Sequence, residues 1–165
     1  MKAQNKPASL NQALELFHFA FRAFTSGPDA LLAEQGLQRV HHRILYFVGR
    51  HPLLSINELL RILGVSKQAL NNPLRTLIET GLIDVQADPR DRRIKRLQLS
   101  LTGLEMEERL SGNQRLLMAE VFEQLGADAE QHWRQIMQAI AMTQFAHLCP
   151  APVPGTDDSQ SDKHQ

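Results

Sequence analysis

The sequence contains one cysteine, few aromatic residues and no long apolar run. The single cysteine, Cys149, cannot form an internal disulfide, and we interpret it as an inert thiol. Aromatic residues make up 5% of a chain that is 42% hydrophobic, which favours a helix-rich protein with an aliphatic core. No apolar run is long enough to cross a bilayer, and the segment Met1 to Asn11 lacks the apolar centre of a signal peptide. We therefore expect a cytoplasmic protein with no membrane partner.

The motifs of common enzymes are missing as well. The chain has no phosphate-binding loop, no nucleophile elbow and no metalloprotease helix. Its 165 residues are enough for one domain with a core and further elements for self-association, but too few for two large domains. We expect no catalytic residue, no cofactor and no metal site, so binding is the favoured activity.

The charges balance in number but not in position. The chain carries 18 Lys and Arg residues and 18 Asp and Glu residues. Residues 1–49 hold five basic and three acidic side chains, residues 50–99 hold nine and five, and residues 100–165 hold four and ten. A positive field that attracts an anionic partner is therefore confined to the central segment.

Helical spacing of apolar residues predicts two helices before residue 50. The first is expected to end where Gly27-Pro28 interrupts it. Its apolar seam consists of Leu10, Leu14, Phe17, Phe21 and Phe24. The second is expected from about Leu37 to Gly49, because His51-Pro52 closes it.

Two more helices are expected after residue 101. Thr102 and Glu105 form a capping box that predicts the start of a long helix reaching about Leu125. Asp128 is expected to cap a last helix, and the prolines that follow rule out its continuation. We expect residues 149–165 to be a disordered tail. The apolar face of the last helix consists of Trp133, Ile136, Met137 and Ile140.

Between these regions lie two short helices joined by a glycine turn. Residues 55–58, Ser-Ile-Asn-Glu, are a capping box that predicts a helix ending at Leu63. Gly64-Val65 makes the turn, and Ser66 is expected to cap a second helix that Gly81 ends. The residues of this second helix that are expected to face the core are Leu70, Leu74, Leu77 and Ile78.

After Gly81 the apolar period changes from helical to two. Ile83 and Val85 share one side, and after a polar loop Leu97 and Leu99 alternate with polar residues, which predicts a β-hairpin. The expected fold class is mainly α with a small β-hairpin wing (α+β). The order of elements is that of a winged helix-turn-helix flanked by amino- and carboxy-terminal helices.

The outward face of the helix after the glycine turn has the chemistry of base reading. Its polar residues form a stripe at spacings of four, opposite the leucines, and residues 66–78 include no acid. Asparagine and glutamine bond adenine edges, arginine and lysine bond guanine, and a serine at a helix start holds phosphate. Pro73 is expected to kink this helix. The predicted DNA-contacting residues are Ser66, Lys67, Gln68, Asn71, Asn72 and Arg75.

The hairpin loop adds a second cationic feature. Residues 88–96 read Asp-Pro-Arg-Asp-Arg-Arg-Ile-Lys-Arg, five cations against two acids. Guanidinium groups suit the strong negative potential of narrow A·T-rich minor grooves. Asp91 is expected to brace a neighbouring arginine rather than touch DNA. The predicted contacts of the loop are Arg90, Arg92, Arg93 and Lys95.

The segment Leu53 to Gly103 closely resembles the MarR family of winged helix-turn-helix regulators. The match lies in Asp91-Arg92-Arg93, Leu99-Ser100 and Gly103, and extends less specifically over about residues 10–148. It implies a bacterial transcription regulator, a homodimer with intertwined terminal helices that places two recognition helices on a pseudo-palindromic operator. Occupancy of a promoter would make it a repressor, found at the nucleoid when bound to double-stranded DNA.

On this interpretation the chain has four parts. They are an amino-terminal dimerisation region over 1–36, a DNA-binding domain over 37–101, dimerisation helices over 102–148, and a tail over 149–165. The resemblance also implies a small aromatic or amphipathic effector that weakens operator binding. Residues able to stack on or bond such a ligand, though equally compatible with packing or surface roles, are Phe21, Arg22, His42 and Tyr46.

Two alternatives stay open. A metal-responsive regulator is suggested by His41-His42, with Glu34, His18 and His51 elsewhere, although adjacent histidines on a helix point in different directions. Alternatively, the basic surface could serve an acidic protein partner. Sequence preference decides between these partners. If Gln68→Ala or Asn71→Ala loses binding to a specific DNA site, the helix must read bases.

Overall fold

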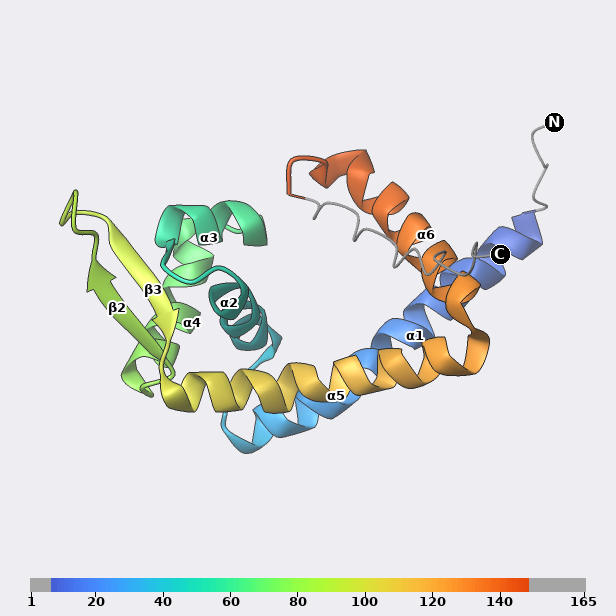
Figure 1. The fold of residues 1–165 in the computed structure, drawn as a ribbon, viewed down its shortest axis with the longest axis horizontal. Coiled ribbons are helices and arrows are strands. Elements are labelled where there is room, and N and C mark those ends of the chain that lie inside the picture. The colour runs from blue at the N-terminus through green and yellow to red at the C-terminus, as the bar shows by residue number, and fades with distance from the viewer. Residues whose placement is uncertain (1–6, 149–165) are drawn as a thin grey trace, which may run out of the picture. The chain divides into compact units, whose positions relative to one another are not determined.

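The computed structural model describes residues 7–148, and the ribbon is drawn in Figure 1. The chain divides into two compact units, one up to Gln124 and one from Leu125 onwards. In chain order the elements are α1 (Pro7–Glu34), α2 (Arg39–Arg50), β1 (Leu54–Ser55), α3 (Ile56–Leu63), α4 (Lys67–Glu79), β2 (Ile83–Ala87), β3 (Lys95–Leu99), α5 (Leu101–Leu125) and α6 (Ala127–Phe145). The tail over 149–165 and its Cys149 lie outside the described residues.

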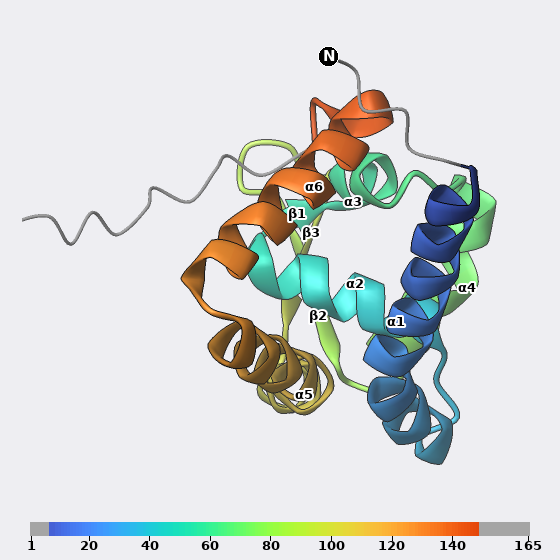
Figure 2. The same cartoon turned by 90° about the vertical axis from the view of Figure 1, so that its right-hand side faces the viewer.

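Helix α2 lies in the middle of the first unit (Figure 2) and supplies much of its core. Its Ile44, Leu45 and Val48 are buried, together with leucines from α3, α4 and β3. Burying each such side chain contributes roughly 1.5–3 kcal/mol. The predicted core positions of α4 are confirmed except for Ile78, which is 37% exposed. That position lies one residue beyond the stripe of leucines, so the core ends before it.

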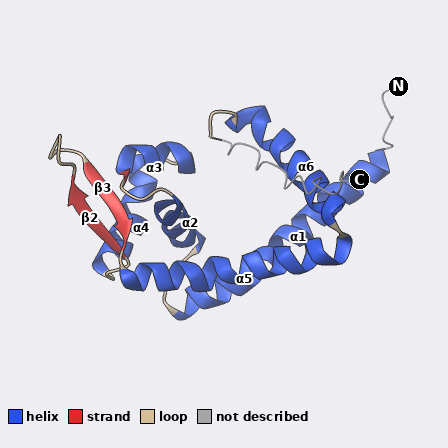
Figure 3. Cartoon of the chain, in the orientation of Figure 1, coloured by secondary structure: helices blue, strands red, loops and turns tan. Residues whose placement is uncertain are grey.

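The predicted hairpin is present and has a third strand that the sequence did not predict. Strands β2 and β3 pair antiparallel with Val85 opposite Leu97, and β1 pairs antiparallel with β3 on its other side. The sheet order is therefore β1-β3-β2, with β3 in the centre. Figure 3 shows the hairpin extending beyond the helices. A two-residue strand such as β1 shows no periodicity, which is why the pattern missed it.

The break predicted at Gly27-Pro28 is wrong, because α1 runs through both residues. Pro28 has no N–H, so the carbonyl of Phe24, four residues earlier, lacks its usual helical donor. Gln114 of α5 supplies one instead, since its Nε2 donates to the Phe24 oxygen over 3.0 Å. The helix therefore tolerates its proline with a hydrogen bond from another helix.

The start of α5 also differs from the prediction. The capping box predicted from Thr102 and Glu105 is wrong, because Thr102 is already helical. The hydroxyl of Ser100 does the capping and accepts from the N–H of Gly103 over 3.0 Å. The hydroxyls of Ser100 and Thr102 both donate to the carbonyl of Gly81, at 2.6 and 3.0 Å. These bonds attach the first turn of α5 to the loop that follows α4.

Gly103 permits this attachment. A Cβ at this position would lie 1.9 Å from the carbonyl oxygen of Leu82, closer than any side chain tolerates. Glycine is needed here because only a residue without a Cβ lets the helix approach the loop this closely, and not because of an unusual backbone angle.

Helix α6 belongs to the second unit. The prediction that Asp128 caps it is wrong, because Gly126 occupies the cap position and makes no side-chain cap. Asp128 lies in the first turn, where its negative charge interacts favourably with the helix dipole. The apolar residues predicted to share one face include three that are exposed, Trp133, Ile136 and Ile140. Over residues 7–148, no helix is long and apolar enough to span a membrane.

Candidate nucleic-acid interface

Two confirmed caps hold the helix-turn-helix in place. The Ser55 hydroxyl accepts from the Glu58 N–H over 3.2 Å, and the Glu58 carboxylate accepts from the Ser55 N–H over 2.8 Å. Gly64 then adopts φ +63°, a left-handed angle that side chains disfavour, and turns the chain between α3 and α4. Ser66 caps α4 with an oxygen 3.2 Å from the Ala69 nitrogen.

The front of α4 presents its polar side chains to solvent. Lys67, Gln68 and Asn71 are exposed, and none forms a side-chain hydrogen bond or ion pair with another described residue. Asn72 and Arg75 are exposed too, but they bond each other: Arg75 Nη2 donates to Asn72 Oδ1 over 3.2 Å. Arg75 also lies 3.8 Å from the Glu79 carboxylate. The first turns of α4 are therefore the part with free donors and acceptors.

Pro73 lies within α4 without ending it. Its missing N–H leaves the Ala69 carbonyl without its usual helical donor, at a residue that is exposed. The kink at this proline stays a prediction.

The wing, defined as β2, β3 and their connecting residues 88–94, is built around two aspartates. Asp88 is buried, and its Oδ1 accepts from the backbone N–H groups of Arg90 and Asp91 at 2.8 and 3.2 Å. The Arg90 amide, then the Arg96 guanidinium and then the Asp91 amide hold the pKa of Asp88 below its ordinary value. The Asp88 N–H donates to the Ile94 carbonyl over 2.9 Å, which closes the loop.

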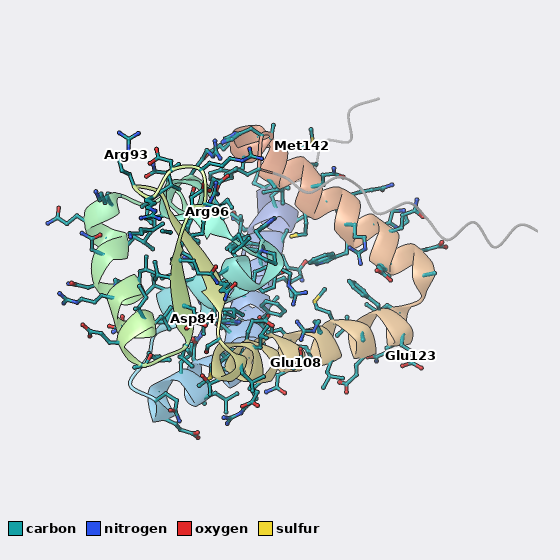
Figure 4. The ribbon with its side chains drawn as sticks, turned by 60° about the vertical axis from the view of Figure 1, so that its left-hand side comes forward. Asp84, Arg93, Arg96, Glu108, Glu123 and Met142 are labelled. Carbon is teal, nitrogen blue, oxygen red and sulfur yellow. The ribbon has the colours of Figure 1, made fainter. Side chains whose placement is uncertain are left out.

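Asp91 braces an arginine, as predicted. Both of its oxygens accept from Arg93, Oδ1 from Nε at 3.0 Å and Oδ2 from Nη2 at 2.9 Å. This pairing lowers the pKa of Asp91. Arg93 remains 91% exposed, and Figure 4 shows it at the tip of the hairpin, pointing away from the domain.

The other predicted wing residues have no such brace. Arg90, Arg92 and Lys95 are exposed, and none of their side chains forms an ion pair within the described chain. The five cations of the loop therefore fall into two groups. Arg93 and Arg96 are paired with aspartates, and the other three have no acidic partner within the described chain and can meet phosphate.

Arg96 is the residue whose role the sequence did not indicate. Its Nε donates to Asp88 Oδ2 over 2.7 Å, and its Nη1 donates to Glu58 Oε2 over 3.2 Å and to the Leu53 carbonyl over 3.3 Å. Glu58 belongs to the capping box of α3, where the Ser55 hydroxyl and N–H lower its pKa first, with a further contribution from Arg96. In the sequence Arg96 looks like one more cation of the loop.

The two aromatic rings predicted to meet an effector each lie beside an arginine. The guanidinium of Arg39 lies 5.4 Å from the Phe21 ring centre, and that of Arg50 lies 5.3 Å from the Tyr46 ring centre. Arg22 is exposed, and His42 is partly buried. Among the described residues, no hydrogen bond, ion pair or ring contact joins any two of the four predicted residues.

The two adjacent histidines have different partners. His41 Nδ1 accepts from the Gln38 N–H over 2.9 Å, and His42 Nε2 lies 3.0 Å from the Ser111 hydroxyl. Burial lowers the pKa of both rings. Over residues 7–148, no group of three or more His, Cys, Asp or Glu side chains could hold a metal ion. The described part of the chain thus offers no ligand set for metal.

Solved structures with this fold include regulators. The chain matches MarR with a TM-score of 0.63 and 22% identity, covering 89% of this chain and 97% of the other. It matches MepR from S. aureus in complex with DNA with a TM-score of 0.63 and 18% identity, covering 78% and 96%. At these identities the likeness supports the winged-helix fold alone.

Sequence comparisons go further. The family described as the MarR family matches residues 35–94, which include α2, α3, α4, β1 and most of the wing. Over 131 residues the chain is 38% identical to the HTH-type transcriptional regulator PetP of Rhodobacter capsulatus, a match that covers 79% of each protein. The protein therefore belongs to the MarR family of winged helix-turn-helix proteins.

Proposed function

We propose that this chain is a transcription regulator that binds double-stranded DNA as a homodimer and represses by occupying a pseudo-palindromic operator. The observation that carries the proposal is the combination of α4 with an arginine-rich wing. On α4 the side chains of Lys67, Gln68 and Asn71 are exposed and have no partner among residues 7–148. Membership of a family of transcription regulators agrees with the expectation that the chain is not an enzyme.

Each part of the surface has its own role in this proposal. The α4 residues read base edges in the major groove, where paired hydrogen bonds distinguish all four base pairs. The wing cations Arg90, Arg92, Arg93 and Lys95 enter the adjacent minor groove and bind phosphates. The helix-bearing segment 37–101 is the DNA-binding domain.

The exposed apolar residues of the terminal helices support dimerisation. On α1, Leu10, Leu14 and Phe17 are exposed, and on α6 Trp133, Ile136 and Ile140 are exposed. Apolar residues at helical spacing that stay in solvent are costly, and a second copy of the chain would cover them. The segments 1–36 and 102–148 then serve dimerisation, and two recognition helices meet successive major grooves.

In this proposal a small aromatic effector binds the protein and releases it from DNA. The exposed rings of Phe21 and Tyr46 each have an arginine beside them, a combination that suits an aromatic anion. We test it by thermal shift with phenolic acids, followed by DNA binding in their presence. If no compound both stabilises the protein and releases DNA, the protein is a constitutive DNA binder.

The central experiment selects genomic fragments with the purified full-length protein and repeats the selection with Asn71→Ala. We expect one enriched motif with inverted repeats, and its loss in the variant. A footprint about twice that of a monomer, and a dimer in analytical ultracentrifugation, support the homodimer. Fragments without a shared motif would contradict specific DNA binding and favour the alternative of an acidic protein partner.

Repression is tested separately with a reporter gene behind the selected motif. Expression is expected to fall when the protein is produced and to recover with Asn71→Ala. A rise in expression would instead make the protein an activator.

A further inference from the structure

We propose that Arg96 is a positioning residue that fixes the wing against the helix-turn-helix and so sets where the wing arginines meet the DNA. This inference rests on the proposed function, because it assigns a cause to the wing's placement on the operator. Arg96 itself touches no base or phosphate in this proposal. Figure 4 shows it further from the hairpin tip than Arg93.

The contacts of Arg96 join three separate segments. One nitrogen, Nε, holds Asp88 of the wing, and another, Nη1, holds both Glu58 of α3 and the Leu53 carbonyl in the loop before β1. The planar guanidinium has five donors in a fixed arrangement, so it can bond several acceptors at once. One side chain therefore fixes the angle between the wing and α3.

The backbone of Arg96 reinforces the same junction. It lies on the central strand β3, opposite Gln86 of β2 and opposite Ser55 of β1. Ser55 is the residue that caps α3 and bonds Glu58. Backbone pairing and side-chain bonding thus connect Arg96 to the same end of α3.

The charges and burial indicate that Arg96 is committed to this junction. Its side chain is 29% exposed, that of Asp88 is 11% exposed and that of Glu58 is 41% exposed. Two carboxylates face one guanidinium, so the cluster has no excess positive charge to offer a phosphate. The unbraced Lys95, its neighbour, is exposed and is available to DNA.

The wing needs such a support. A two-stranded hairpin alone is marginally stable in water, and β1 adds only two residues of pairing, opposite Arg96 and Leu97 of β3. Leu53 provides a second sign of constraint, because its φ of +64° is left-handed and unfavourable for a leucine. Such a residue persists where its surroundings determine it, and its carbonyl is one of the Arg96 acceptors.

The test compares Arg96→Met with Lys95→Met, which remove the same charge from neighbouring positions. Affinity for the selected operator is measured at increasing salt concentrations, which gives the salt slope. It is also measured on operators whose core motif is flanked by A·T-rich or by G·C-rich sequence, which gives the flank preference. For Lys95→Met we expect a salt slope smaller by about 0.9 and a preference for A·T flanks that the remaining wing arginines largely keep. For Arg96→Met we expect a slope smaller by about two, because several wing cations lose their phosphates, and a preference that falls towards none.

Glu58→Gln separates positioning from charge. Glutamine also serves in a capping box, so the start of α3 is retained. Removal of an acid strengthens DNA binding if charge alone matters. If Arg96 positions the wing, Glu58→Gln instead weakens the preference for A·T flanks. Arg96→Lys is expected to keep only part of the flank preference that Arg96→Met loses, because lysine lacks the planar fork. Tighter binding of Glu58→Gln with an unchanged flank preference would overturn the proposal.

Hydrogen exchange in the free protein decides the inference without DNA. The amides of Asp88 and Ile94 close the wing loop. In Arg96→Met their exchange should rise by about tenfold or more, since charge-assisted bonds are lost, while amides in α2 keep their rates. Unchanged exchange at the loop would refute the brace. If the wild type binds no specific DNA but the wing-loop amides of Arg96→Met exchange faster, the proposed function is refuted while the support of the wing by Arg96 stands.

Discussion

The recognition helix α4 and the wing both carry predicted DNA-contacting residues, but they hold them differently. On α4 the leading residues Lys67, Gln68 and Asn71 are exposed and have no side-chain partner among the described residues. In the wing, Asp91 holds Arg93, and Asp88 holds Arg96. The helix needs no side-chain brace because its backbone is already rigid and capped. The hairpin protrudes (Figure 3) and relies on aspartates for its shape.

This difference has a consequence for recognition. Free amides on a rigid helix suit base edges, where the geometry of paired hydrogen bonds decides specificity. Cations on a braced loop suit phosphates and groove width, where placement of charge matters more than individual bonds. Four predictions test the division, from the largest expected effect to the smallest.

Asn71→Ala should have the largest effect on specificity. Loss of a paired contact to one base is expected to cost about 1–3 kcal/mol against the preferred sequence, and to leave binding to other sequences nearly unchanged. Asn72→Ala is the matched control, because its amide oxygen already accepts from Arg75. Competition binding with operator variants measures both, and equal losses would remove the distinction between the two asparagines.

Arg92→Ala should weaken binding to all sequences. Arg92 has no ion-pair partner within the described chain, so its loss is expected to lower the salt slope by about 0.9. Arg93→Ala should change the slope less, because Asp91 already neutralises that guanidinium. Affinity measured from low to high salt gives both slopes. A larger change for Arg93 would mean that its pairing with Asp91 is exchanged for phosphate.

Acid should loosen the wing before it affects α4. The pKa values of Asp88 and Glu58 are lowered in the folded protein, so their stabilisation is present above their ordinary values, near 4, and is lost as the pH falls through the lowered values. Hydrogen exchange between pH 6 and pH 3 should show earlier opening of the wing loop than of α4. Simultaneous opening would count against an electrostatic brace.

Leu53→Gly should have the smallest effect. Glycine relieves the left-handed angle, and we expect the free energy of unfolding to rise by up to about 1 kcal/mol. The carbonyl remains available to Arg96, so DNA affinity should stay the same. Urea unfolding measures the first quantity. A loss of stability would show that the leucine side chain contributes more than its backbone angle costs.

The sequence predicts the helix-turn-helix well because its signals are local. Capping boxes, a glycine turn and the leucines of α4 each act within a few residues, and the structure confirms the caps at Ser55 and Ser66. The wing follows from a change of period and a cluster of arginines. Asp91 as a brace was predictable because its partner is two residues away.

The errors arise where distant partners decide the outcome. The helix through Pro28 depends on Gln114, which lies 90 positions from the carbonyl it satisfies. The role of Arg96 depends on Glu58, which belongs to another element. The cap of α5 is Ser100 and not the predicted Thr102. The hydroxyls of both residues donate to the carbonyl of Gly81, a contact that no local pattern contains.

The close contact at Gly103 fixes one end of the long helix α5. The helix has 25 residues, so at 1.5 Å per residue its far end lies about 37 Å from its start. Its first turn is fastened to the loop after α4 by Ser100, Thr102 and the close approach at Gly103. For a rigid helix pivoting at this attachment, a displacement of about 3 Å at the far end corresponds to a rotation of about 5° at its start. A larger residue at position 103 would move the pivot itself.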